Sequence, residues 1–342
     1  MVLSKRRIEE VREQREQLLS GEWLTMDQVQ QDKLISEFID GYVLPPLSVF
    51  CPTIFRARQN IGEELFSQIN ELLAPPAEAV TRLGRLNQAY TPTLYLAGTA
   101  FSAVAETRAP RGSVVSVLAC RMKREVEPFT VAPLAMTRLR GSPRTGPMSQ
   151  ILTAGPLGNQ WFADILQREN LTEQWLLQDE TIGALLVADV PVAQQQALYR
   201  ATNHVRDYLY RTFPDYEGVQ YPSILVRRTS PNIALDKMRW RDVEPAEVWV
   251  LRVDDDIAHR PYRSSLATQS LIKFGVVQGS GEIRYQSTST TLLQAWNDFK
   301  QKHGQVSSGA GPPTLVRPFT RYRISYGLDL NRRVYDFLPP DW

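Results

Sequence analysis

Apolar residues recur at helical spacing along several stretches of the chain. Between residues 4 and 40 they fall every three to four positions, which predicts two amphipathic helices with a break near Thr25. A longer stripe covers residues 193–212 and follows Pro191, and it predicts the clearest helix of the chain. Further helices are expected at residues 62–73, 162–177 and 292–302, and at residues 101–107 with Thr99 as N-cap.

Runs rich in β-branched residues predict the strands. Residues 114–120 form the clearest of these runs, because valines dominate it. A hairpin is expected where residues 272–277 and 282–286 flank a Gly-Ser-Gly turn. The remaining extended segments are expected at residues 49–50, 54–57, 93–96, 248–253 and 319–326, in a short strand that ends at Ser223, and at residues 182–192 as an apolar strand or buried segment. This mixture of elements indicates a soluble mixed α/β protein.

The composition is ordinary for a globular protein of one large or two smaller domains, with 342 residues of which 43% are hydrophobic. A net charge of +2 gives no bulk attraction to nucleic acid or a membrane surface, and no apolar run reaches the roughly 18 residues of a membrane span. The basic N-terminus leads into Glu9 and Glu10, so no secretory signal is expected. Cys51 and Cys120 are expected to be buried free thiols, which fits a cytoplasmic location.

Several common sites can be excluded from the sequence. The three histidines, His204, His259 and His303, have no partners at metal-ligand spacing, so no metal is expected. The chain has no Gly-rich phosphate loop, no Gly-x-Ser-x-Gly motif and no Rossmann fingerprint. What remains is one constellation of polar residues.

That constellation includes Arg85 in Gly84-Arg85-Leu86-Asn87, Tyr95 in Leu94-Tyr95-Leu96-Ala97, Glu106 in Ala103-Val104-Ala105-Glu106, and Ser223 in Tyr221-Pro222-Ser223. Taken singly, each residue has an ordinary explanation: Tyr95 in core packing, Glu106 as a favourable charge at a helix start, and Ser223 in a turn. Their order and spacing together resemble the RES family, which is named for its Arg, Glu and Ser. Asn232, nine residues after Ser223, also fits this pattern.

The chain departs from the family pattern in the segment around Arg85. Leu86 stands where the family commonly has an aromatic residue, and Gln88-Ala89-Tyr90 replaces a turn that commonly contains Pro and Gly. The first arginine of the pattern can be either Arg56 or Arg58. The turn is therefore expected to differ from that of the family, and the choice between the two arginines stays open.

The resemblance also implies a division of the chain into three parts. Residues 1–45 form an N-terminal helical segment that ends at Pro45-Pro46, residues 46–252 form the RES domain, and residues 253–342 form a C-terminal α/β extension. An insertion is expected at about residues 125–190, because the segment between the Glu and Ser motifs is long. The implied fold class is α+β, with an ADP-ribosyltransferase-like core of two small packed sheets.

Characterised RES proteins are toxins of toxin–antitoxin pairs, and they consume NAD. The resemblance therefore implies that NAD is the substrate, that its nicotinamide–ribose bond is broken, and that a cognate antitoxin protein is a partner. Glu106 would stabilise the oxocarbenium-like transition state. Arg56 and Arg85 would bind the pyrophosphate, Tyr95 would stack on nicotinamide, and Ser223 would contact the substrate or hold Glu106.

Several alternatives stay open at this point. The acceptor can be water, phosphate or, in an ADP-ribosyltransferase, a protein side chain. A non-catalytic binding module with the same fold is a third alternative. The segments 1–45 and 253–342 could act as an internal cover or a targeting element, and a homo-oligomer is not excluded.

Overall fold

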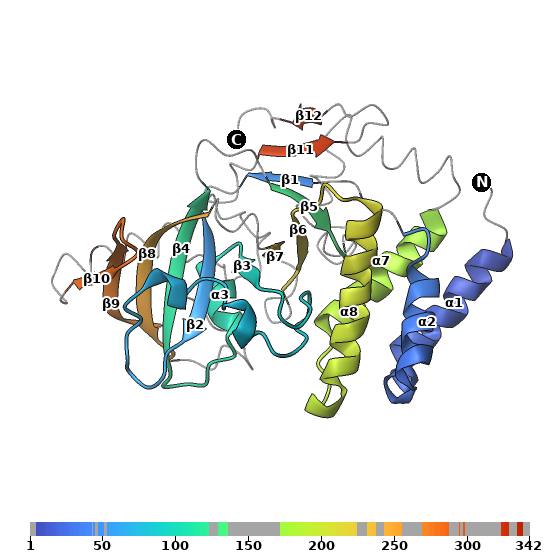
Figure 1. Ribbon diagram of the computed structural model, residues 1–342, viewed down its shortest axis with the longest axis horizontal. Helices are drawn as coiled ribbons and strands as arrows, with labels where there is room; N and C mark the ends of the chain where they lie inside the picture. The colour runs from blue at the N-terminus through green and yellow to red at the C-terminus, as the bar shows by residue number, and fades with distance from the viewer. Residues whose placement is uncertain are drawn as a thin grey trace, which may run out of the picture.

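The computed structural model describes residues 5–42, 44, 47–50, 53–122, 129–135, 172–223, 231–236, 243–254, 269–286, 294, 297, 323–327 and 334–337. It is a mixed structure in which helices gather at one end and a large, mostly antiparallel sheet forms the rest (Figure 1). The α+β class implied by the sequence is therefore confirmed.

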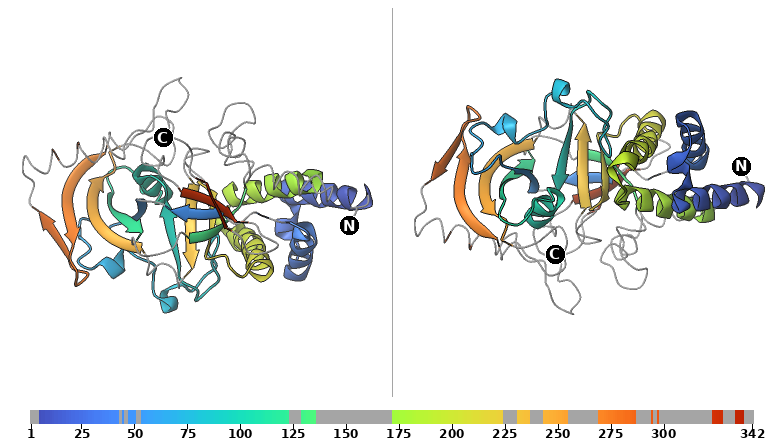
Figure 2. Two further views of the ribbon diagram at one scale, coloured as in Figure 1. Left: turned by 90° about the horizontal axis from the view of Figure 1, so that it is seen from above. Right: turned by 90° about the horizontal axis from the view of Figure 1, so that it is seen from below.

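The described strands belong to one twelve-stranded sheet. Their bounds are β1 (Leu47–Phe50), β2 (Ile54–Gln59), β3 (Thr93–Ala97), β4 (Val114–Met122), β5 (Phe129–Pro133), β6 (Gly218–Pro222), β7 (Pro231–Asp236), β8 (Val243–Arg252), β9 (Ser270–Val277), β10 (Ile283–Gln286), β11 (Arg323–Gly327) and β12 (Val334–Phe337). The order across the sheet is β10-β9-β8-β4-β2-β3-β7-β6-β5-β1-β11-β12, and the pair β5 and β6 is parallel. Figure 2 places β9 and β10 at the end of the molecule opposite the long helices.

The sheet is narrowest at the junction between β2 and β3. One residue pair, Phe55 with Ala97, joins these strands, whereas six pairs join β2 to β4 and five join β3 to β7. The two packed sheets implied by the family resemblance are thus one continuous sheet with a weak junction. Next to this junction, the carbonyl of Tyr95 accepts a hydrogen bond from the Arg56 side chain at 3.0 Å. A side chain therefore supplies a bond where strand pairing is minimal.

In the described part of the chain, four long helices pack beside β6 and β7, in the middle of the strand order: α1 (Lys5–Ser20), α2 (Gln28–Ile39), α7 (Thr172–Val187) and α8 (Val192–Thr212). Helix α1 packs on α7, and α2 packs on α8. Asp27 caps α2 by accepting a hydrogen bond from Gln30 N at 2.9 Å. The four helices share a core with Leu86, Val219 and Tyr221. None of the described helices is long and apolar enough to cross a membrane.

A fifth helix, α3 (Ala100–Glu106), covers the same sheet face nearer to β2 and β4. Along β3, Tyr95 packs against the core of the long helices, while Ala97 packs in the core under α3. These two residues are two positions apart and therefore share a face. Leu94 and Leu96 point to the opposite face, which has a core of its own. The sheet surface around Tyr95 thus lies between α3 and the long helices.

The strongest sequence patterns predict their elements correctly. The stripe at 193–212 is α8, the valine-rich run lies within β4, and the expected hairpin is formed by β9 and β10. Thr99 is the N-cap of α3, because its hydroxyl accepts a hydrogen bond from Ser102 N at 3.1 Å. In each case, local periodicity or capping chemistry was sufficient to specify the element.

One predicted element is wrong, and a second is wrong in one of its two alternatives. Residues 62–73, all of them described, contain a short 3-10 turn (Ile69–Glu71) in place of an α-helix. The Glu71 carboxylate accepts hydrogen bonds from Ser67 N and Gln68 N, and this closes the segment into a turn. For residues 182–192 the strand alternative is wrong, because residues 182–187 continue helix α7, whereas the buried alternative holds for Ile182, Leu185 and Leu186. Periodicity over a short apolar run does not separate a buried helix from a buried strand.

Some expectations fall on parts of the chain that the structure does not describe. They include Cys51, most of the insertion expected at about residues 125–190, residues 162–171 of the helix expected at 162–177, and the helix at 292–302 apart from residues 294 and 297. Cys120 is described and lies fully buried as a free thiol in β4, as expected. Burial raises the pKa of this thiol to about 12, because the thiolate would lose its hydration.

Candidate active site

Three of the five predicted site residues, Tyr95, Glu106 and Ser223, come together on one face of β3, β7 and β6. Tyr95 of β3 pairs with Ala234 of β7, and Asn232 of β7 pairs with Tyr221 of β6. Because residues directly opposite one another share a face, the two tyrosines and Asn232 lie on the same surface. Ser223 follows two residues after Tyr221 and continues that face. Strand register therefore brings together positions that are far apart in the sequence.

Glu106 reaches this surface from the last residue of α3. The expectation that it sits at a helix start is wrong, and the difference matters. A carboxylate at a helix C-terminus faces the negative end of the helix dipole, which disfavours it by about 0.3–1 kcal/mol. The helix alone therefore does not explain why a glutamate occupies this position.

Two donors from the sheet hold the Glu106 carboxylate. The Ser223 hydroxyl donates a hydrogen bond to Glu106 Oε1 at 2.5 Å, and Asn232 Nδ2 donates to the same oxygen at 2.9 Å. Both donors are almost fully buried, with 1% and 2% exposure respectively. Hydrogen bonds of this kind to a charged group are stronger than those between neutral groups. The carboxylate is thus fixed in orientation above β6 and β7, between α3 and the two tyrosines.

The Tyr95 side chain is held at its hydroxyl. It accepts a hydrogen bond from Leu86 N at 3.0 Å and donates one to Asn87 Oδ1 at 2.8 Å. Its ring meets that of Tyr221 edge to face, with the centroids 6.4 Å apart. Burial raises the pKa of Tyr95 to about 12, so the hydroxyl remains a donor at neutral pH. The ring position is therefore set by the segment that carries Leu86 and Asn87.

That segment, residues 84–88, is a tight turn, called here the 84–88 turn. Gly84 N donates a hydrogen bond to Asn87 O at 3.0 Å. A Cβ atom on Gly84 would lie 2.0 Å from Asn87 Oδ1, a distance at which the two atoms would clash. Glycine is therefore required because the Asn87 side chain packs directly over it. The Gly and Asn of the family-like motif thus share one physical cause.

The structure places the two candidate arginines in different surroundings. Arg56 lies beside the junction of β2 and β3, where it binds the Tyr95 carbonyl, and its Nε is buried with no hydrogen-bond partner among the described residues. Burial, together with the neighbouring Arg58, lowers the pKa of Arg56 to about 10. Arg58 instead donates to the Glu71 carbonyl and lies over the Phe66 ring at 5.6 Å. Of the two, Arg56 is therefore the one beside Tyr95.

Arg85 occupies a position that the sequence did not indicate. Its Nη1 donates hydrogen bonds to the carbonyls of Leu186 and, at 3.4 Å, Leu185 in the last turn of α7. Its guanidinium also lies 5.4 Å from the centroid of the Tyr199 ring on α8. A cation at this point complements the negative end of α7. The pyrophosphate role expected for Arg85 stays a prediction, and in this structure its contacts are with the helices.

Tyr221 is a residue of the site that the sequence reasoning did not assign. It lies directly across from Asn232, and burial together with the Glu106 carboxylate raises its pKa well above the usual range. Its position two residues before Ser223 was the available signal, since alternate residues of a strand share a face. The hydroxyl of Tyr221 therefore stays protonated near the Glu106 carboxylate.

Chemically, these residues combine groups that suit a substrate that develops positive charge. A fixed carboxylate stabilises such charge, the partly buried ring of Tyr95 offers a flat apolar surface, and Arg56 offers a cation for an anionic group. Asn232 Oδ1 is buried and has no partner among the described residues, so an acceptor also remains for a ligand. Within the same part of the chain, no group of three or more His, Cys, Asp or Glu side chains is arranged to hold a metal ion.

Comparisons with known proteins give one match. The sequence matches no protein-family model and no curated protein. Among solved structures, the chain is similar to one described as the crystal structure of the M. tuberculosis MbcT–MbcA toxin–antitoxin complex, at 14% identity over 67% of this chain and 92% of that chain. The TM-score is 0.31, which is too low to establish a shared fold. The site is therefore interpreted from its own geometry.

Proposed function

We propose that the protein is an enzyme that cleaves NAD at the bond between nicotinamide and ribose. The observation that carries this proposal is the Glu106 carboxylate, held by Ser223 and Asn232 against the natural preference of a helix C-terminus. A carboxylate at this unfavourable position is explained if its role is to stabilise positive charge that develops on the substrate. The RES-like order of the same residues points to NAD as the substrate.

In this mechanism Glu106 faces the ribose as nicotinamide departs. The sugar then has oxocarbenium character, and its positive charge interacts more strongly with a fixed carboxylate than the neutral ribose of bound NAD does. Ser223 and Asn232 keep the carboxylate in place, so little reorganisation is needed during the reaction. Glu106 would thereby lower the barrier more than it tightens substrate binding.

Arg56 and Tyr95 supply binding in the same proposal. The buried Nε of Arg56 would donate to a pyrophosphate oxygen, and its planar guanidinium suits that group. The ring of Tyr95, held in place by the 84–88 turn, would stack on nicotinamide. No bound metal or second cofactor is required for these steps, because the nicotinamide ring is positively charged in NAD and leaves as a neutral molecule with the electron pair of the broken bond.

The test is nicotinamide release from NAD by the purified protein, with and without phosphate. The Glu106→Gln variant keeps the shape of the side chain and removes its charge, so kcat should fall by about a hundredfold to a thousandfold. The KM should change much less. Glu217→Gln is a matched control, because Glu217 is a partly buried carboxylate that accepts a hydrogen bond from Thr130 N at 2.8 Å at the other end of β6. The control should keep its turnover.

The outcomes separate the competing functions. Release that needs phosphate identifies a phosphorylase, and release without phosphate identifies a hydrolase. ADP-ribose attached to proteins of a lysate, detected by mass spectrometry, would instead identify an ADP-ribosyltransferase. If calorimetry detected neither NAD nor ADP-ribose binding, the enzyme proposal would be wrong and a non-catalytic module would be favoured.

The same proposal includes a restraining partner. An enzyme that consumes NAD damages the cell that makes it, and the RES-like motifs imply a toxin with a cognate antitoxin protein. Such a partner would block nicotinamide release when added in equimolar amount. Co-expression with neighbouring open reading frames, followed by the same release assay, tests this part of the proposal.

A further inference from the structure

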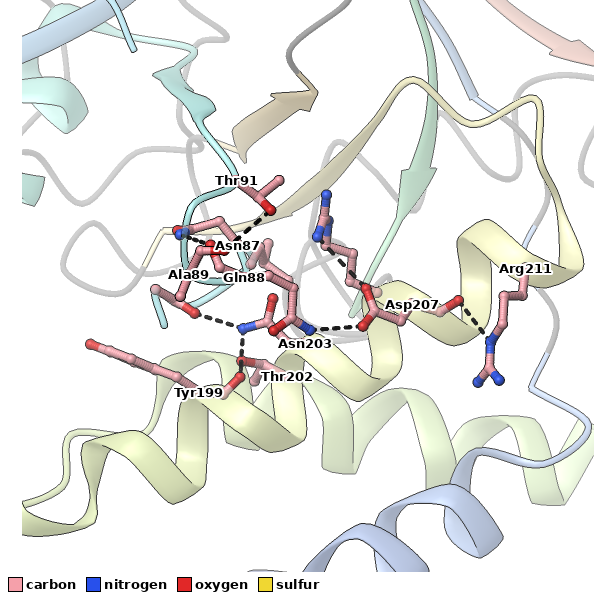
Figure 3. A network of polar contacts seen from close by, with 12 residues as sticks. Asn87, Gln88, Ala89, Thr91, Tyr199, Thr202, Asn203, Asp207 and Arg211 are labelled. Atoms are coloured by element: carbon pink, nitrogen blue, oxygen red, sulfur yellow. Dashed lines mark hydrogen bonds and ion pairs between the residues drawn. The ribbon is translucent and has the colours of Figure 1, made fainter. Parts of the chain in front are cut away.

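Several side chains of helix α8 form hydrogen bonds with the 84–88 turn (Figure 3). Asn203 Nδ2 donates a hydrogen bond to the Gly84 carbonyl at 2.7 Å, and the Thr202 hydroxyl donates to the Arg85 carbonyl. Gln88 Nε2 reaches in the other direction and donates to Asp207 Oδ2 at 2.8 Å. Three residues of the turn, Gly84, Arg85 and Gln88, are therefore bonded to one helix.

Asn203 has the most demanding environment of these residues. It is 1% exposed, and its single amide nitrogen donates both to Gly84 O and to Tyr199 O, each at 2.7 Å. Its own carbonyl oxygen is buried with no partner among the described residues. An unpaired buried acceptor is unfavourable, so an apolar residue of similar size would avoid that cost. The same replacement would leave the Gly84 carbonyl without its Asn203 donor, so the asparagine is explained by the carbonyls that its amide nitrogen binds.

What the donors hold leads directly to Tyr95. The turn that Asn203 grips carries Leu86 N and Asn87 Oδ1, and these two groups bind the Tyr95 hydroxyl at 3.0 and 2.8 Å. The path from α8 to the aromatic ring thus passes through one short segment of five residues. No other step is needed to connect the helix with the surface that carries Glu106.

We propose that Asn203 is a positioning residue that sets the Tyr95 ring through the 84–88 turn. It does not reach the reacting atoms, and its effect on the substrate passes through Tyr95. The readout on substrate binding rests on the proposed function, in which Tyr95 stacks on nicotinamide. The mechanical coupling of Asn203 to Tyr95 can be measured independently of that function.

The experiment compares Asn203→Leu with a control that has the same local chemistry. Gln178 of α7 is also buried, donates to two carbonyls (Phe38 O at 2.6 Å and Asp40 O at 3.1 Å), and has an unpaired buried Oε1 among the described residues. Gln178→Met removes these bonds far from the turn. Both variants should lower the midpoint of thermal unfolding by a few degrees. Only Asn203→Leu should raise the KM for NAD, by about tenfold, with a smaller change in kcat.

A double-mutant cycle with Tyr95→Phe tests the route of the effect. In the Tyr95→Phe background the hydroxyl link is already absent, so Asn203→Leu should change the KM by less than about twofold. Equal KM effects in both backgrounds, or a wild-type KM for Asn203→Leu, would overturn the proposal. If the wild-type protein neither cleaves nor binds NAD, the proposed function fails. The cycle is then read from unfolding midpoints, where non-additive shifts support the coupling and additive shifts refute it.

Discussion

Replacing Gly84 with alanine tests the link between the 84–88 turn and Tyr95 most directly. The new Cβ would lie 2.0 Å from Asn87 Oδ1 and 2.9 Å from Asn87 Cγ, and both are side-chain atoms. Ordinary contact needs more than 3.4 Å to these atoms. The Asn87 side chain would therefore have to move by more than 1 Å (roughly the shortfall in that contact).

That movement breaks the hydrogen bond from the Tyr95 hydroxyl to Asn87 Oδ1, which is 2.8 Å long. A buried donor left without its partner costs about 1–3 kcal/mol. An off-rotamer Asn87 adds about 0.5–1.5 kcal/mol. The free energy of unfolding should therefore fall by about 2–4 kcal/mol, and the KM for NAD should rise because Tyr95 is no longer fixed.

Chemical denaturation of Gly84→Ala gives the first quantity, and nicotinamide release gives the second. Gly279→Ala is the matched control, because a Cβ there would meet no atom within 4 Å. The decisive comparison is Gly84→Ala in the Asn87→Ala background, where the clashing atoms are absent. The reasoning is refuted if Gly84→Ala costs as much there as in the wild-type protein.

Three further predictions follow from the same structure. Arg56→Lys should raise the KM for NAD about tenfold, because the planar donor set of the guanidinium is lost. Arg58→Ala removes contacts to Glu71 and Phe66 and should leave the KM unchanged. Steady-state kinetics with the opposite order would assign pyrophosphate binding to Arg58. Deleting residues 1–42 should yield insoluble or unfolded protein, because α1 and α2 bury Val11, Leu18 and Phe38 against α7 and α8. Each of these side chains contributes about 1.5–3 kcal/mol by burial. A product that is soluble by gel filtration and more active in the release assay would show that α1 and α2 are a removable cover. The stability contributed by the neutral, buried Cys120 thiol is present below its unfolded pKa of 9 and is lost as the pH rises toward its folded pKa of about 12. The free energy of unfolding of Cys120→Ala should therefore fall less steeply with alkaline pH than that of the wild-type protein, by at most about 1.4 kcal/mol per pH unit. Chemical denaturation between pH 9 and 11 that gave the same slope for both proteins would contradict this.

Sequence patterns predicted the elements whose cause is local. The stripe of α8 needs only neighbouring residues at helical spacing, and β4 needs only a run of β-branched side chains. The N-cap of α3 is likewise decided within four residues. The helix expected at 62–73 is wrong because hydrogen bonds to the Glu71 carboxylate close that segment into a turn. The strand alternative for 182–192 is wrong because residues 182–187 continue α7.

The members of the site could also be named from the sequence, because their order resembles a known family pattern. Their arrangement could not. Ser223 and Glu106 are 117 residues apart, and only the register of β6 beside β7 and the end of α3 bring the hydroxyl to the carboxylate. The choice of Arg56 over Arg58 as the neighbour of Tyr95 depends on the weak junction of β2 and β3.

Arg85 shows most clearly that the sequence identifies a residue whereas tertiary packing decides its contacts. The sequence identified it within a motif, but its guanidinium lies on the end of α7, about 100 residues later in the chain. The grip of Asn203 on the 84–88 turn is also long-range, at 119 residues. Local sequence determines which helices and strands form, because backbone propensity and apolar periodicity act over a few residues. The positions of the site's charged groups and hydrogen-bond donors are decided by tertiary packing, because hydrogen bonds between residues so far apart in the sequence form only when the helices and strands pack together.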